Sequence, residues 1–174
     1  NRKNYNDISE QQVFQNMDVV FGGGYKFFTA ADREDKQDLI SEIKGQGYQL
    51  VADKKQFDAI TDGKVFGLFA PSDLPYELDR KQDEPALPEM TSKAIQLLSK
   101  DKDGFFLMVE GSKVDWAAHN NAPAALTGDI KAFDDAVGIA LNYAKTNKDT
   151  LVIVASDHGN GGISMGNEAT SGNY

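Results

Sequence analysis

Two short clusters of acidic residues and histidine stand out, because they contain the only two histidines in the chain. In EGSKVDWAAH, Glu110 precedes Asp115 and His119, and the later SDHG contains Asp157 and His158. Asp115 and His119 are spaced i, i+4, so on a helix their side chains project from the same face. Carboxylate plus imidazole suits catalytic zinc, whereas an all-oxygen ligand such as Glu110 suits magnesium. These residues are therefore candidate metal ligands.

Structural roles for the same residues remain open from spacing alone, because short motifs also arise by chance. Asp115 could cap the helix that contains His119 by accepting hydrogen bonds from its free N–H groups. His119 could be a surface histidine, and Glu110 a solvated residue at the end of a strand. The metal hypothesis is favoured because both histidines lie beside carboxylates and closely follow apolar runs.

Short apolar runs alternate with segments of helical spacing, and this alternation is typical of an α/β fold. We expect a mostly parallel sheet with helices on both faces. Expected strands are 18–22, 48–52, 64–70, 104–110 and 150–159, and expected helices are 33–48, a short helix through Phe57 and Ile60, 89–100 and 129–147. Sites in such sheets lie beyond the carboxyl ends of the strands. If strands 104–110 and 150–159 are neighbours, the two clusters converge there.

Composition restricts the function further. The length of 174 residues suits one domain or part of a larger one, and we predict a single α/β domain over 1–174. The net charge of −9 argues against nucleic-acid binding, and no apolar run is long enough for a membrane-spanning helix. With no cysteine, disulfides and thiolate zinc sites are excluded. The first residue is not methionine and the last residues are TSGNY, so we expect a fragment of a longer protein.

The run FFLMVEGSKVDWAAHNN, followed by AFDDAV and TLVIVASDHG, resembles the C-terminal half of bacterial-type alkaline phosphatases. The similarity extends through GLFAPSDLPYELDR, PALPEMTSKAI and DVVFGGG, and so covers most of the chain. It implies an incomplete alkaline-phosphatase-like core. It also implies a phosphate monoester substrate, hydrolysed through a phosphoserine intermediate with two zinc ions and one magnesium ion. A periplasmic or secreted location and a homodimer are further implications.

The resemblance also assigns individual residues. Glu110 matches the magnesium-binding glutamate, Asp115 and His119 match two ligands of the first zinc, and Asp157 and His158 match ligands of the second zinc. The segment GNGGIS after the second cluster resembles a family loop but suggests no chemistry of its own.

Trp116 stands where the family has a variable residue near the substrate phosphate, so the resemblance makes it a candidate substrate-binding residue. A plain packing role is equally open, because aromatic residues are more often packing groups.

The family's nucleophile has no match here. No Asp-Ser-Ala-type segment occurs, neither Ser112 nor Ser156 corresponds to the nucleophile, and there is no third histidine. We therefore expect no catalytic residue in this chain, and no activity from it alone. The alternative function is a non-catalytic, acidic α/β module that binds metal or a protein partner. A related phosphodiesterase or mutase fits less well, because those relatives generally lack the EGSKVDWAAH motif.

Overall fold

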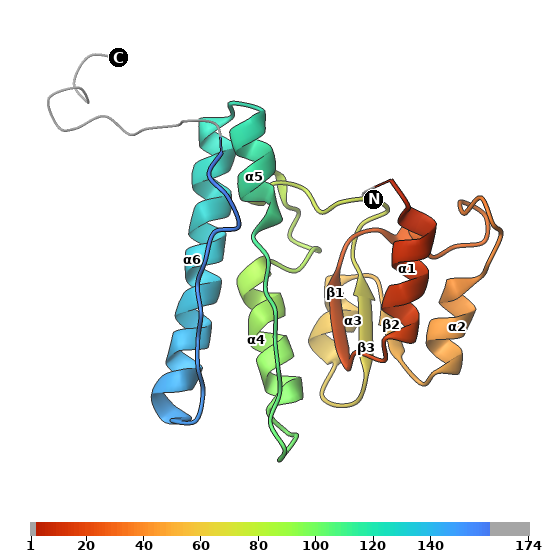
Figure 1. The fold of residues 1–174 in the computed structure, drawn as a ribbon, viewed down its shortest axis with the longest axis horizontal. Coiled ribbons are helices and arrows are strands. Elements are labelled where there is room, and N and C mark those ends of the chain that lie inside the picture. Colours follow the sequence, from red (N-terminus) through yellow and green to blue (C-terminus); the bar gives the residue numbers. More distant parts are fainter. Residues whose placement is uncertain (1–2, 161–174) are drawn as a thin grey trace, which may run out of the picture.

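A three-stranded, all-parallel sheet lies in the N-terminal part of the computed structural model, which describes residues 3–160 (Figure 1). Its strands are β1 (Val19–Gly22), β2 (Gln49–Val51) and β3 (Val65–Leu68), in the order β1-β3-β2. The register pairs Gly22 with Leu68, so the carboxyl ends of β1 and β3 lie at the same edge. Three of the predicted strands are thereby confirmed.

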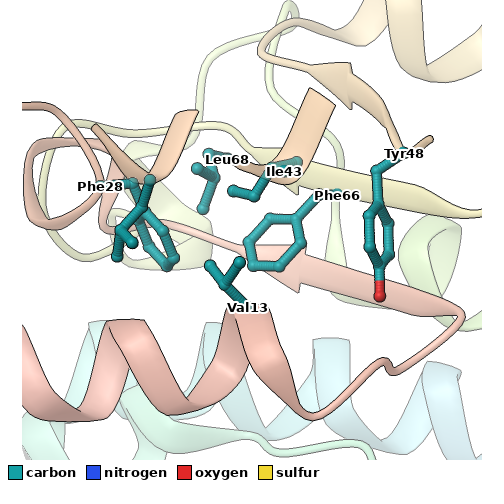
Figure 2. Close-up of a cluster of buried hydrophobic side chains, with 7 residues drawn as sticks. Val13, Phe28, Ile43, Tyr48, Phe66 and Leu68 are labelled. Carbon is teal, nitrogen blue, oxygen red and sulfur yellow. The ribbon is translucent and has the colours of Figure 1, made fainter. Parts of the chain in front are cut away.

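Helices cover both faces of this sheet, with α1 (Tyr5–Phe14) and α2 (Leu39–Gly45) on one face and α3 (Lys54–Ala59) and α4 (Leu87–Leu98) on the other. The remaining elements are α5 (Ser112–His119), α6 (Pro123–Thr146) and the 3₁₀ turns η1 (Tyr25–Phe27) and η2 (Glu77–Asp79). Successive side chains of a strand point to opposite faces. On the central strand, Phe66 accordingly packs with Val13 of α1 and Ile43 of α2 (Figure 2). Val65 packs on the other face with Phe57 of α3. The predicted fold class is confirmed.

Helices α4, α5 and α6 form a second group beside the sheet (Figure 1), with α6 packed along both α4 and α5. The start of α5 lies close to α6, because a Cβ added to Gly111 would lie 2.9 Å from the Phe133 ring. No helix within residues 3–160 is long and apolar enough to cross a membrane.

Two predicted strands do not form within the described part of the chain. Residues 104–110 and 150–159 are drawn as open coils in Figure 1. A strand requires a neighbouring strand for its ladder of backbone hydrogen bonds, and no strand among the described residues pairs with either segment. Their apolar side chains consequently remain exposed, with 89% of Phe106 and 77% of Ile153 accessible to solvent.

The predicted helix 33–48 is shorter than expected, since α2 begins only at Leu39. Asp38 caps it by accepting a hydrogen bond from the Ser41 backbone N–H at 3.1 Å. Before that cap, Lys36 has a positive φ of 59°, which is incompatible with a continuing helix. Helix α6 is longer than predicted, because Pro123 occupies a position at which proline suits the start of a helix.

Candidate metal-binding site

Helix α5 presents Asp115 and His119 together, as their spacing predicts. The Oδ1 atom of Asp115 lies 3.5 Å from Nε2 of His119. The N-cap of α5 is Gly111, and no side chain caps this end of the helix. The alternative role of Asp115 as the helix cap is therefore wrong, and its carboxylate is available for a ligand.

The second cluster meets the first at Asp115. Nε2 of His158 lies 3.6 Å from Oδ1 of Asp115 and 3.4 Å from Oδ2 of Asp157. Tetrahedral zinc with bonds of about 2.0–2.2 Å holds adjacent ligand atoms about 3.3–3.6 Å apart. The distances within the two predicted ligand pairs, 3.5 Å for Asp115 and His119 and 3.4 Å for Asp157 and His158, fall within that range. Both the chemistry and the spacing of these donors thus fit zinc.

The described residues do not form a complete metal cage. No group of three or more acidic or histidine side chains among residues 3–160 is arranged to hold one ion. The exposed Glu110 forms no hydrogen bond or ion pair with a described residue. The structure therefore brings together Asp115, His119, Asp157 and His158, whereas no ion pair or hydrogen bond among the described residues links Glu110 to them. Its assignment to magnesium stays a prediction.

Asn160 is a neighbour of the site that sequence reasoning missed. Its Nδ2 donates to Oδ1 of Asp115 at 2.7 Å and to the Asp115 backbone oxygen at 3.1 Å. The bond to Oδ1 orients the Asp115 carboxylate, and the bond to the backbone oxygen holds Asn160 against α5. Proximity to SDHG in the sequence was the only available signal, because an asparagine within a glycine-rich segment suggests no specific role.

The Trp116 side chain is partly packed and partly exposed to solvent. The side chain is 46% exposed and lines an open hollow together with Asp115, His119 and Asn120. The Lys113 ammonium lies 3.9 Å from the centre of the indole. The indole therefore packs against a cation while it also forms part of the wall of the candidate site. A contact with substrate stays a prediction.

A salt bridge joins α5 to the segment that follows β3. The Lys113 ammonium pairs with the Asp73 carboxylate, and its hydrogen bond is the largest cause that lowers the pKa of Asp73 below the ordinary value of 3.8. At the other end of α5, Asn120 donates to the Tyr76 hydroxyl at 2.8 Å. Both ends of the helix that carries Asp115 are thus linked to residues 73–76.

A family model described as alkaline phosphatase matches residues 1–174. The chain belongs to the alkaline phosphatase family. It is 43% identical to alkaline phosphatase 3 of Bacillus subtilis strain 168 over 171 residues, which are 95% of this chain and 36% of that protein. The predicted resemblance is confirmed, and the chain corresponds to part of the catalytic domain.

Solved structures agree with this assignment. The cold-active alkaline phosphatase of a psychrophilic Shewanella species is 38% identical, with a TM-score of 0.76 over 85% of this chain and 35% of that chain. A variant of the alkaline phosphatase from the Antarctic bacterium TAB5 is 32% identical, with a TM-score of 0.72 over 84% of this chain and 42% of that one. That variant is described with magnesium bound in its M3 site. The family is metal-dependent, and this chain spans well under half the length of these relatives.

Proposed function

We propose that this chain supplies metal ligands to an enzyme that hydrolyses phosphate monoesters through a phosphoserine intermediate. The observation that supports this most directly is the position of Asp115, whose Oδ1 lies within 3.6 Å of Nε2 of both histidines. In the proposal, Asp115 and His119 hold one zinc ion, and Asp157 and His158 hold a second. Glu110 holds magnesium.

The metal pair, when bound, would stabilise the attacking and leaving oxygens of an in-line displacement at phosphorus. The chain's own residues prepare that site. Asn160 holds the Asp115 carboxylate in one orientation through its hydrogen bond of 2.7 Å. Such bonds to ligating groups typically set both orientation and metal affinity. Trp116 forms one wall of the hollow and limits how a substrate can approach.

The proposal assigns the nucleophilic serine and the remaining metal ligands to residues outside this chain. Catalytic zinc ordinarily has three protein ligands, whereas each predicted zinc receives two here. We therefore expect the isolated chain to be catalytically silent. Incubation with zinc, magnesium and a chromogenic phosphate monoester is the direct check, because turnover that depends on both protein and metal would refute this silence.

Replacement of His119 by alanine in the natural protein separates the enzymatic role from the alternative. We expect loss of phosphatase activity together with loss of zinc. If the natural protein loses zinc but never had phosphatase activity, the chain is instead part of a non-catalytic binding module. A periplasmic or secreted location and a homodimeric state also belong to the proposal. Cell fractionation and sedimentation of the natural protein test them.

A further inference from the structure

Lys113 is unusually well covered for a lysine on a surface helix. Its side chain is only 13% exposed. The ammonium pairs with Asp73 and lies 3.9 Å from the centre of the Trp116 ring and 5.2 Å from that of Tyr76. A charge removed from water must be compensated by partners, and here a carboxylate and two aromatic faces provide that compensation. The ammonium is already satisfied by these groups, so it is not a free anion-binding charge.

The partner of Lys113 is itself anchored to the sheet. A Cβ added to Gly23, directly after β1, would lie 2.2 Å from the backbone oxygen of Ser72. In the same region, the backbone N–H of Lys26 donates to the oxygen of Pro71 at 3.0 Å. The backbone just before Asp73 is thus in contact with the carboxyl end of β1. The ion pair connects α5 to this edge of the sheet.

The position of Lys113 makes this connection relevant to the candidate site. Lys113 lies in the first turn of α5, two residues before Asp115 and three before Trp116. Residues three apart are neighbours on a helix surface, which explains how the ammonium reaches the indole. A rotation of α5 about its axis would break the ion pair between Lys113 and Asp73 and would displace Asp115 and His119 together.

We propose that Lys113 is a positioning residue, which fixes Trp116 and the metal-binding face of α5 to the sheet edge through Asp73. We call the contacts among Lys113, Asp73 and Trp116 the clamp. Its existence is a claim about structure alone. Its effect on metal affinity rests on the proposed function.

The test uses the 174-residue chain, because Trp116 is its only tryptophan and reports on the clamp directly. Lys113→Met removes the charge and keeps a long side chain. We expect a shifted tryptophan emission and easier quenching by acrylamide. Asp73→Asn should produce the same change, and the double variant should add little to either, since all three break one connection. Lys113→Arg should restore much of the wild-type signal, because arginine also pairs with carboxylates and stacks on rings.

The matched control is Lys131→Met on α6, which removes an exposed lysine paired with Asp135 and should leave tryptophan emission unchanged. Unchanged emission and quenching in both Lys113→Met and Asp73→Asn would overturn the clamp. If Lys113→Met fails to fold, Asp73→Asn and Lys113→Arg decide the same question.

The zinc affinity of the natural protein provides the second measurement. We expect Lys113→Met to weaken zinc binding by about tenfold, as is common for residues that orient metal ligands. If the optical signal changes while zinc affinity does not, the clamp stands but its positioning role is overturned. If the wild-type natural protein binds no zinc at all, the proposed metal site fails, while the optical comparison still decides the clamp.

Discussion

Oδ1 of Asp115 lies 3.6 Å from Nε2 of His158, although these residues come from separate segments of the chain. The same oxygen is 3.5 Å from Nε2 of His119 and accepts a hydrogen bond from Asn160. Asp115 is therefore the point at which the two clusters meet. A site organised in this way should depend most strongly on this one carboxylate.

Asp115→Asn should weaken zinc binding by at least about tenfold. The amide has the same shape but lacks the negative charge that favours a divalent cation. Competition with a fluorescent zinc indicator measures the affinity. Asp135→Asn is the matched control, because it removes an exposed carboxylate of α6 that pairs with Lys131. Equal zinc affinities for the two variants would contradict a ligand role for Asp115.

Asn160→Ala should also weaken zinc binding, by no more than Asp115→Asn does. It removes the hydrogen bond that orients the Asp115 carboxylate without removing a proposed ligand. We expect zinc affinity to fall by about tenfold, as is typical when an outer-shell partner is lost. Calorimetric titration with zinc gives the affinity and the number of bound ions. A change in that number without a change in affinity would argue against an orienting role.

The sequence predicted strands correctly where other described residues cover their apolar side chains. The runs at β1 and β3 read as strands, and their side chains alternate between the two cores. Residues 104–110 have equally strong strand patterning but form no strand within residues 3–160. Apolar periodicity shows that a segment favours burial, but it does not show which neighbour provides it.

The candidate site was predictable to a similar extent. Spacing placed Asp115 and His119 on one helix face, because a helix has a fixed period. Asn160 and the pairing of Lys113 with Asp73 could not be predicted, because amides and lysines are common surface residues. Only the fold shows that their side chains contact this site.

Gly23→Ala should destabilise the protein by about 1–3 kcal/mol, since a Cβ there would lie 2.2 Å from the backbone oxygen of Ser72. Backbone cannot move aside as a flexible side chain can. Asp73 directly follows Ser72 and pairs with Lys113, which contacts the Trp116 ring. A shift of Ser72 should therefore also change the fluorescence emission of Trp116. The matched control is Gly45→Ala at the end of α2, where a Cβ would meet nothing within 4 Å. Urea denaturation measures both variants, and equal midpoints would contradict the predicted clash.

Asp129→Asn should stabilise the protein near neutral pH. Burial, the largest cause, raises the pKa of the Asp129 carboxyl above its ordinary value of 3.8; the hydrogen bond from the Glu77 backbone N–H opposes this shift, and the charge of Glu77 adds to it. A group with a raised folded-state pKa contributes stability that is complete below pH 3.8 and is lost as the pH rises through the folded-state pKa. The ionised carboxylate is therefore unfavourable at neutral pH. Because the side chain is partly exposed, we expect a gain of only about 0.5 kcal/mol.

The pH dependence provides the sharper check on Asp129. Denaturation midpoints of wild type and Asp129→Asn should converge below pH 3.8, where both side chains are neutral. An advantage that persists unchanged in acid would show that the gain has another cause. Asp135→Asn, on an exposed part of the same helix, should show no comparable gain at neutral pH.

The isolated chain should self-associate. Phe106 is 89% exposed and Ile153 is 77% exposed, and both lie in apolar segments that form no strand within the described residues. Exposed apolar surface and unpaired backbone both favour pairing with another chain. The apparent mass from light scattering should therefore rise with concentration. A chain that stays monodisperse and monomeric and has high thermal stability would contradict this prediction.

Substitutions identify the surface responsible for association. Phe106→Lys combined with Ile153→Lys should keep the isolated chain monomeric, whereas Ile130→Lys, at a 49% exposed position on α6, should leave association unchanged. In the natural protein the same double substitution should act in the opposite direction. If further chain covers Phe106 and Ile153 there, two buried lysines would lower the melting temperature, because unpaired charges are costly to bury. If the double substitution reduces association of the isolated chain and does not lower the melting temperature of the natural protein, this surface remains exposed in the natural protein as well.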